Sequence, residues 1–546
     1  MIFFAKVDYF SYFCKNKKLN LMKTRFLLLF LVIVGIANAQ SIEVGGTQTG
    51  VWEADTVLVV SDVKVADSLT VAPGTVVLFD GFYSIIVVEG ASFKAQGTED
   101  DGIRFTVADT TGFSMYNSYK GGWNGFRVQN AGEVRLDYCV VEYAKAADTT
   151  DMSGGAMRIE NSDNVVANHS TFRCNRARES GGAVSAVNSH VVMNDCVVND
   201  NGIYDDDNIY ARYGAALHFL KCDVDLQVME FLRNRGDGCI GGAISFDSCS
   251  VVLDRAVFVD NIALNGGGLY MMRSNHLPGR LSNLLFDHNY SWHFAGGLAF
   301  SDTSPEVYNI LVTNNDSEGV NCTGIFFYQQ SSPRLTNCIV YGNYPEPNEI
   351  LQDTIEMWVW TYDDYAPEFR NCLIEGGTDH VTNAEYIKVF EDILEGDPLF
   401  VDAENHDFRL SEESPCRDVG NADVPDFLAS GFDLNWIKRV SNDRIDIGPY
   451  EYSAASVPSN PVGSTDARLL GNPLSAMSRI EFGHEITGET VVSVYSMTGR
   501  KVGSKVFNLD RACVLEIGSL ADRLASGVYL IEVAVPDRAF TLKAVR

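Results

Sequence analysis

The densest cluster of potential metal ligands in this sequence is Asp205-Asp206-Asp207, which is followed by Asn208. Carboxylate and amide oxygens are the ligands that Ca²⁺ prefers. These acids are consecutive, however, and lack the alternate spacing of a Ca²⁺-binding loop. Two interpretations therefore stay open, a Ca²⁺ site and a solvated turn, and no other cofactor is predicted.

A second group is aromatic. Trp358, Trp360 and Tyr362 occupy alternate positions of one stretch, and alternate residues of a strand point to the same side. Such a row could stack on sugar rings as a binding platform. Packing of a terminal segment would place the same residue types there and is the simpler interpretation.

Residues with the spacing of an active site are missing. A hydrolase of the pectinase type needs paired carboxylates, within a succession of Asn-Thr-Asp, Asp-Asp, Gly-His-Gly and Arg-Ile-Lys that this sequence lacks. The nine histidines are scattered, and His218, beside Ala216 and Leu217, fits an ordinary strand residue. The sequence predicts no catalytic residue.

The elements that must position these groups are repeats. An apolar residue followed three places later by asparagine recurs between Gly154 and Asn343, at steps of 26, 33, 27, 28, 26 and 28 residues, after Gly-rich openings such as Gly181-Gly182-Ala183. The asparagines are Asn175, Asn201, Asn234, Asn261, Asn289, Asn315 and Asn343. A fixed period of this length is the signature of a solenoid.

The repeats contain short alternating runs, such as Val191-Val192-Met193, and no helical apolar stripe. Coils made only of strands and turns predict an all-β fold, a right-handed parallel β-helix of the pectin-lyase-like kind. Stacked coils place like residues above like, so the seven asparagines are predicted to form a hydrogen-bonded ladder beside an apolar one. With their Gly-Gly-Ala and Phe-x-x-Asn phrases, the repeats resemble the polymorphic outer-membrane proteins, which are β-helical surface adhesins.

The amino terminus predicts export. Lys23 and Arg25 precede an apolar run that ends at Ala37-Asn38-Ala39, which is typical of a secretory signal peptide. The run is too short to span a membrane securely, and no transmembrane segment is predicted in the mature chain. Residues 1–39 are thus upstream residues plus signal peptide, with the true start expected at Met22.

Composition narrows the partners. The net charge of −30, from 72 acidic against 42 basic residues, argues against nucleic acid, which requires a basic surface. Without Cys14, eleven cysteines remain, an odd number that leaves at least one thiol unpaired within the monomer. Cys139, Cys196, Cys338 and Cys372 occupy similar points of their coils and are expected to stack inward as small apolar residues.

Three regions follow the β-helix, which is assigned to residues 40–395. Asp397-Pro398-Leu399-Phe400, Asp407-Phe408-Arg409-Leu410 and Gly448-Pro449-Tyr450 resemble the choice-of-anchor segment that closes many secreted bacterial β-helices. This closing segment, residues 396–452, is expected to mark the end of the helix. Residues 453–466, rich in Ser, Pro and Ala, are expected to form a linker.

Residues 467–546 hold short alternating strands, enough for a small C-terminal β-sandwich. With Gly527, Tyr529, Lys543 and Arg546 in the terminal motifs, this region resembles the sorting domain of the type IX secretion system of Bacteroidota. The resemblance implies the type IX machinery as a partner. It also implies a protein secreted from, or attached to, the outer-membrane surface of a Gram-negative bacterium.

Two classes of function stay open. Resemblance to adhesins and the missing catalytic motifs favour a non-catalytic surface protein that binds a polysaccharide or another protein. The alternative is a polysaccharide lyase or glycoside hydrolase acting on extracellular carbohydrate, because parallel β-helices host such enzymes.

Overall fold

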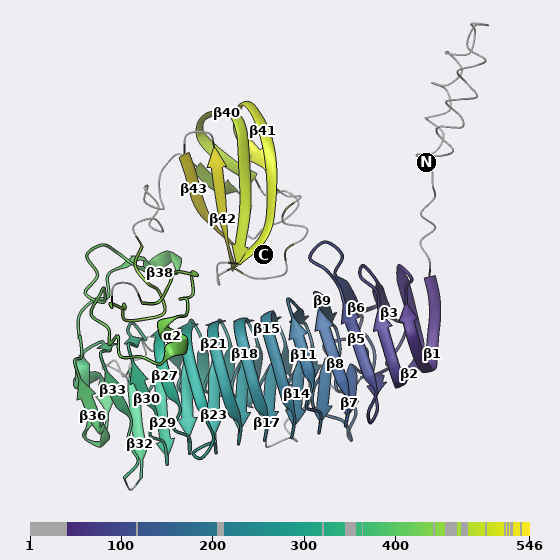
Figure 1. Ribbon diagram of the computed structural model, residues 1–546, viewed down its shortest axis with the longest axis horizontal. Coiled ribbons are helices and arrows are strands. Elements are labelled where there is room, and N and C mark those ends of the chain that lie inside the picture. Colours follow the sequence, from purple (N-terminus) through teal and green to yellow (C-terminus); the bar gives the residue numbers. More distant parts are fainter. Residues whose placement is uncertain are drawn as a thin grey trace, which may run out of the picture.

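The molecule is a right-handed parallel β-helix with an antiparallel domain standing on its long side (Figure 1). The computed structural model describes residues 41–115, 118–204, 212–318, 322–343, 356–362, 364–440, 443–453, 467–470, 479–496, 500–517, 520, 524, 528–535 and 538–545. Within this part of the chain, no helix has the length and apolar character needed to cross a membrane.

The first coils are built by two long strands, β1 (Ser41–Trp52) and β2 (Thr56–Val71), which pair in parallel and bend at two shifts of register. From there each coil contributes to three faces of one 30-stranded parallel sheet. Strands of equivalent position pair in parallel from coil to coil, as Met157–Glu160 does with Val184–Val187. This is the stacking that the repeat period predicts.

The first face consists of β4 (Ile85–Val87), β7 (Phe126–Gln129), β10 (Met157–Glu160), β14 (Val184–Val187), β17 (Leu217–Leu220), β20 (Ile244–Asp247), β23 (Leu269–Met272), β26 (Leu298–Ser301), β29 (Ile325–Gln329), β32 (Met357–Thr361) and β35 (Val381–Thr382). The second face consists of β5 (Ser92–Gln96), β8 (Glu133–Asp137), β11 (Val165–Asn168), β30 (Arg334–Thr336), β33 (Glu368–Arg370) and β36 (Val389–Glu391). The third face consists of β3 (Val76–Phe79), β6 (Ile103–Val107), β9 (Cys139–Glu142), β12 (Thr171–Arg173), β31 (Ile339–Val340) and β34 (Leu373–Ile374).

In the middle of the stack, single strands run through the second and third faces. They are β15 (His190–Asn199), β18 (Asp223–Leu232), β21 (Ser250–Val259), β24 (Gly279–Asp287) and β27 (Glu306–Thr313). Each bends at one residue with positive φ, such as Asp195 (φ 53°) or Asn309 (φ 53°). A shorter sheet lies at another corner, built by β13 (Arg176–Ala177), β16 (Gly202–Ile203), β19 (Arg235–Ile240), β22 (Ile262–Asn265), β25 (Tyr290–Phe294) and β28 (Asp316–Ser317).

The interior is a continuous apolar core that runs along the stack. Phe231, Phe258 and Phe286 stack with ring centroids 4.6 Å apart at each step. Cys139, Cys196, Cys338 and Cys372 are buried in the same core as free thiols, which confirms the prediction that they stack inward. The Gly-rich start of each repeat leaves no space for a side chain, since a Cβ on Gly242 would lie 1.9 Å from the carbonyl oxygen of Gly267.

The closing segment lies along the side of the stack as well as at its end. It contains β37 (Phe400–Asp402), η3 (Ala403–Asn405), β38 (Asp407–Leu410) and α2 (Asp426–Ala429), and it follows η1 (Gly377–His380) and η2 (Ala384–Tyr386). Its apolar side chains, among them Phe408 and Leu434, pack on outward residues of the third face. The expectation that this segment only marks the end of the helix is therefore too narrow.

Two asparagines at the bends of long strands anchor the closing segment. Asn309 donates from Nδ2 to the carbonyl oxygens of Asp446 and Gly448, each at 3.0 Å. Asn283 accepts from Arg439 Nε at 3.0 Å, and the Arg439 side chain is fully buried. These bonds join residues 139 and 156 positions apart in the sequence, so the closing segment and the coils form one packed body.

The C-terminal domain is one antiparallel sheet of β39 (Ala467–Leu470), β40 (Arg479–Ser496), β41 (Lys501–Glu516), β42 (Val528–Val535) and β43 (Arg538–Val545). Shifts of register within the β40–β41 pair let the sheet curl around a core of its own, which contains Val492, Tyr529 and Ile531. Figure 1 shows this domain above β15 and β18.

Candidate functional site

The aromatic row predicted from the sequence lies on the outside of the first face. Strands β29 and β32 pair so that Phe326 lies beside Trp358 and Tyr328 beside Trp360. The opposite side of β32 supplies Met357 and Val359, which are fully buried in the core. The tryptophans therefore do not fill the coil interior, and the packing interpretation holds only for Trp358, which lies half-buried against Phe326.

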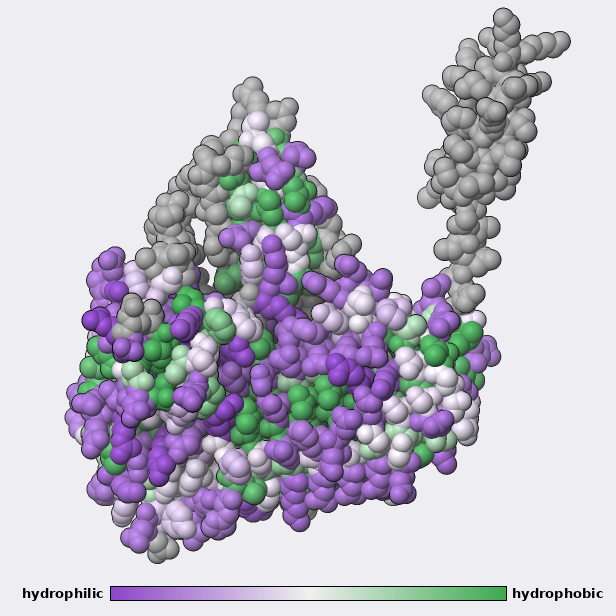
Figure 2. All heavy atoms as spheres, in the orientation of Figure 1, coloured by the Kyte–Doolittle hydropathy of each residue, from purple (hydrophilic) through white to green (hydrophobic). Residues whose placement is uncertain are grey.

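The rings that lie over the buried Phe326 form one surface, which we name the aromatic platform: Tyr328, Trp358, Trp360 and Tyr362. The two indoles stack with centroids 5.0 Å apart, and the Tyr328 ring lies 5.7 Å from that of Trp360 and 6.4 Å from that of Tyr362. Trp360 is 40% exposed and Tyr362 is 44% exposed. Most of the visible surface is hydrophilic (Figure 2), whereas these two aromatic rings are open to solvent.

Polar groups border the platform. Asp302 accepts from the backbone N–H of Gln330 at 3.3 Å and lies next to Ser301, whose hydroxyl reaches Gln329 Oε1 at 3.5 Å. On the neighbouring coils, Arg273 pairs with the buried Asp247. The platform thus combines flat apolar rings with hydrogen-bonding groups at its edge.

The seven repeat asparagines form a hydrogen-bonded ladder inside a corner of the coils. Asn234 is typical: its backbone N–H and its Nδ2 donate to Asn261 Oδ1 at 3.0 and 2.9 Å, and Nδ2 also donates to the Val198 carbonyl at 2.8 Å. All seven are fully buried. This role is structural, because every side-chain group is used within the stack.

The ladder ends on a carboxyl group that the sequence period did not reveal. Glu356 accepts from the Asn343 backbone N–H at 3.1 Å and from Asn343 Nδ2 at 2.6 Å. Burial raises the pKa of Glu356 well above its ordinary value, and Glu375 adds to the rise, while the bonds from Asn343 oppose it. Glu356 therefore takes the place of an eighth asparagine at the end of the ladder.

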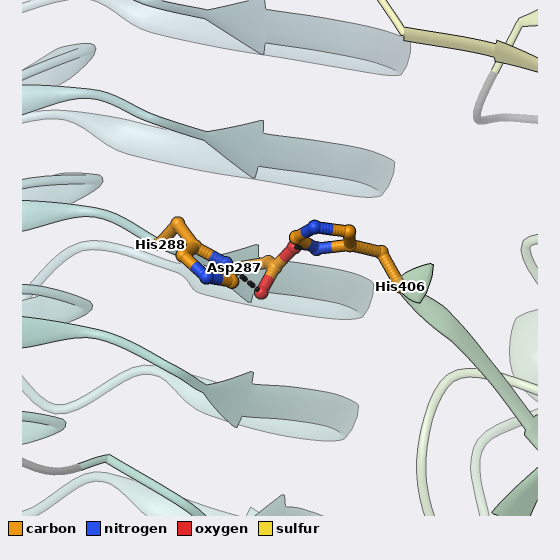
Figure 3. A group of neighbouring side chains, drawn as sticks. All are labelled: Asp287, His288 and His406. Atoms are coloured by element: carbon orange, nitrogen blue, oxygen red, sulfur yellow. Dashed lines mark hydrogen bonds and ion pairs between the residues drawn. The ribbon is translucent and has the colours of Figure 1, made fainter. Parts of the chain in front are cut away.

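Two groups of metal-ligand side chains occur in the part of the chain that the structure describes. Glu356, Glu375 and His380 form one, but both oxygens of Glu356 already serve the ladder. The other is Asp287, His288 and His406 (Figure 3). Asp287 Oδ1 lies 2.7 Å from His288 Nδ1, and its Oδ2 lies 2.6 Å from His406 Nδ1.

The Asp287 carboxylate is held ionised. Burial opposes its ionisation, but the hydrogen bonds from His288 and His406 outweigh burial and lower the pKa to about 2. Asn314 Nδ2 also donates to Oδ1 at 2.8 Å. Sequence reasoning missed this cluster because His406 is 119 residues from Asp287 and belongs to a region expected to be a terminal cap.

A groove of about 630 Å³ separates the third face from the C-terminal domain. The His169 ring stacks on Tyr138 with centroids 4.5 Å apart, and its Nδ1 lies 2.6 Å from Asp195 Oδ2. From the C-terminal domain, Arg500 Nε lies 3.2 Å from Asp195 Oδ1. A histidine oriented by a carboxylate can transfer protons. The residues of this groove therefore form a second candidate site, in addition to the aromatic platform.

The remaining predicted residues are placed only in part. Asp205, Asp206 and Asp207 lie outside the described residues, as do the signal peptide, Gly527 and Arg546, so their assignments stay predictions. Tyr529 is buried in the core of the C-terminal domain, and Lys543 lies in β43.

Comparison with known proteins supports the fold. Residues 227–384 match the family model described as "Right handed beta helix region". That range holds the asparagine ladder from Asn234 onward and the aromatic platform. No curated protein matches the chain.

Proposed function

We propose that this protein is a surface β-helix that binds an extracellular polysaccharide through the aromatic platform. The observation that carries the proposal is the outward group of Tyr328, Trp360 and Tyr362 on two neighbouring coils whose interior is already filled by other residues. Exposed tryptophan and tyrosine provide large rigid contact areas at low entropic cost. A sugar ring presents a C–H face that can pack on such a ring and hydroxyls that can bond to its polar border.

Polysaccharide is favoured over a protein partner by the composition of this border. Asp302 and Gln329 supply oxygen acceptors that suit sugar hydroxyls. Neighbouring parallel strands are about 4.8 Å apart. This spacing is close to the length of one sugar residue, so rings on successive coils are placed to contact successive sugars. A chain of sugars running along the stack could therefore contact both coils of the platform at once.

The test is retention in a native gel cast with each of a panel of neutral and acidic polysaccharides. Trp360→Ala and Tyr362→Ala should each reduce retention at least about tenfold, which is the loss of about 1.4 kcal/mol of binding free energy. Trp436→Ala is the matched control, because Trp436 is 46% exposed but lies in the closing segment. Binding of a purified surface protein, with no polysaccharide retained, would replace the glycan by a protein partner.

We also propose export by the type IX secretion system, supported by the terminal motifs of the C-terminal domain. Deletion of residues 470–546 should then leave folded β-helix in the periplasm. Normal amounts of the truncated protein in the medium or on the cell surface would reject this route.

A second candidate, a polysaccharide lyase, is favoured by the groove at His169. A lyase abstracts a proton next to a carboxylate, and Arg104 and Arg173 border the groove where a uronate could bind. Both arginines already pair with the buried Glu142, however, so less positive charge is left for a substrate. Release of unsaturated uronate products, abolished by His169→Ala, would establish this activity.

A further inference from the structure

We propose that Asp287, His288 and His406 form a binding site for one divalent transition-metal ion, with Zn²⁺ the expected ion. This inference is independent of the aromatic platform, which belongs to another face. Two imidazoles and one carboxylate are a ligand set that zinc sites use, and a set of three protein ligands leaves the fourth position for water. Such a nitrogen-rich set suits zinc better than Ca²⁺ or Mg²⁺, which prefer oxygen.

The three ligand groups converge from two separate segments. Asp287 is the last residue of β24, and His288 follows it at positive φ (55°). His406 follows η3, also at positive φ (59°), and its ring reaches the carboxylate from the other side (Figure 3). Their ligand atoms all lie within 4.8 Å of one another, so small movements of these side chains bring all three into contact with one ion.

The site is rigid on both sides, which favours metal affinity because little order has to be gained on binding. Asn289, the residue after His288, is locked in the ladder by bonds to Asn315 Oδ1 at 3.0 and 2.9 Å. On the other side, Phe408 anchors the His406 segment in the core between the closing segment and the third face. The Asp287 carboxylate is further oriented by Asn314.

Stacking of the coils does not explain this set of residues. The position of Asp287 is occupied by Asn199, Leu232, Val259 and Thr313 in neighbouring coils, according to the strand register. Equivalent positions to His288 hold Asp200, Arg233, Asp260 and Asn314, all with positive φ. Among these coils, only one combines a carboxylate with an imidazole, and it is the coil that the His406 segment reaches.

The surroundings suit a cation. Asp260 interacts electrostatically with Asp287, His288 and His406, and it is exposed on the preceding coil. The His288 side chain is 46% exposed, so an ion can enter from solvent. A neutral imidazole that moves its proton from Nδ1 to Nε2 frees the Nδ1 lone pair for the ion, and this exchange needs no further reactant.

The experiment uses the purified full chain carrying no histidine tag, freed of metal by a chelator and titrated with Zn²⁺ in a calorimeter. Co²⁺ serves as a second probe, because its visible absorption reports the geometry of its ligands. Wild type should bind about one equivalent. His406→Ala and His288→Asn should each weaken binding at least about tenfold, since even the loss of a group that hydrogen-bonds to a metal ligand costs metal sites about 10- to 100-fold.

His288→Asn is the conservative variant, because Asn314 occupies the equivalent position of the next coil with the same backbone conformation. His276→Ala is the matched control, since His276 is an exposed histidine of another turn, and it should bind like wild type. Melting in the presence of chelator checks that each variant is folded. The proposal is overturned if wild type takes up no Zn²⁺, or if His288→Asn and His406→Ala bind it as tightly as wild type.

Discussion

The closing segment covers one part of the third face of the β-helix, and the C-terminal domain covers another. The outward residues of the third face differ between these two parts. Under the closing segment, the outward row is aliphatic and buried: Val257, Leu285, Leu311, Ile339 and Leu373. Under the C-terminal domain, the same row continues toward the amino terminus as Glu230, Val197, Thr171 and Val140. The closing segment forms an apolar core with the third face, whereas the C-terminal domain leaves a polar groove.

This difference indicates which part of the chain is held more firmly to the coils. A dry aliphatic contact cannot be opened without exposing apolar area to water. A polar groove with ion pairs, such as that of Arg500 with Asp195, costs little to open. We infer that the closing segment is a permanent part of the body, whereas the C-terminal domain can be removed without loss of fold.

The largest expected effect comes from two truncations. A chain that ends at residue 453 should stay folded and soluble, with nearly the same melting temperature for the β-helix. A chain that ends at residue 395 exposes five aliphatic side chains, each worth roughly 1.5 to 3 kcal/mol when buried, and should aggregate. Circular dichroism melts and gel filtration distinguish the two. Equal behaviour of the two truncations would erase the contrast between the covers.

The asparagine ladder runs inside the coils. Its hydrogen bonds are alike under the closing segment and near the C-terminal domain, so it serves as an internal control for the comparison of the two covers. Asn234→Leu and Asn289→Leu should each destabilise the fold by about 1 to 3 kcal/mol, because each leaves buried polar neighbours without partners. Asn234 lies near the boundary between the covers and Asn289 beneath the closing segment, yet the cost should be alike. Unchanged denaturant midpoints for both variants would reject the ladder as a source of stability.

The end of the ladder predicts a pH dependence. Because the pKa of Glu356 is raised on folding, its contribution is present at low pH and is lost as pH rises above the ordinary value of 4.5. Glu356→Gln does not titrate. Its stability relative to wild type should therefore increase with pH, by about 1.4 kcal/mol for each unit of pKa shift expressed. Parallel stability curves for the two proteins between pH 4 and 8 would show that folding does not raise the pKa of Glu356.

The smallest effect compares one substitution under the two covers. Val257→Ala, in the dry core, should cost about 2 kcal/mol, while Val197→Ala, beside the groove, should cost under about 1 kcal/mol. Urea denaturation measures both. A larger loss at Val197 would mean that the C-terminal domain packs as tightly as the closing segment.

The sequence predicts the parts of this molecule that repeat. The period of apolar residue and asparagine identified the β-helix, and alternation placed Trp358, Trp360 and Tyr362 on one side of a strand. Alternation alone could not tell whether that side faces inward, because this depends on which side of the strand packs in the core, here the side of Met357 and Val359.

The features that the sequence did not predict lie at contacts between chain segments that occur at one place in the molecule and do not repeat from coil to coil. Glu356 ends the ladder after residues 344–355 interrupt the period, so no spacing pointed to it. Asn309 is one of many asparagines until the closing segment binds it. His406 and Asp287 become neighbours only because that segment folds back along the coils, which no local pattern encodes.

The most direct test of the account is a crystal structure of the chain with an oligosaccharide from whichever polysaccharide it retains. The account predicts a sugar ring stacked on Trp360 or Tyr362, with hydroxyls bonded at the border near Asp302. A sugar bound instead in the groove beside His169, or none bound at the aromatic platform, would contradict it.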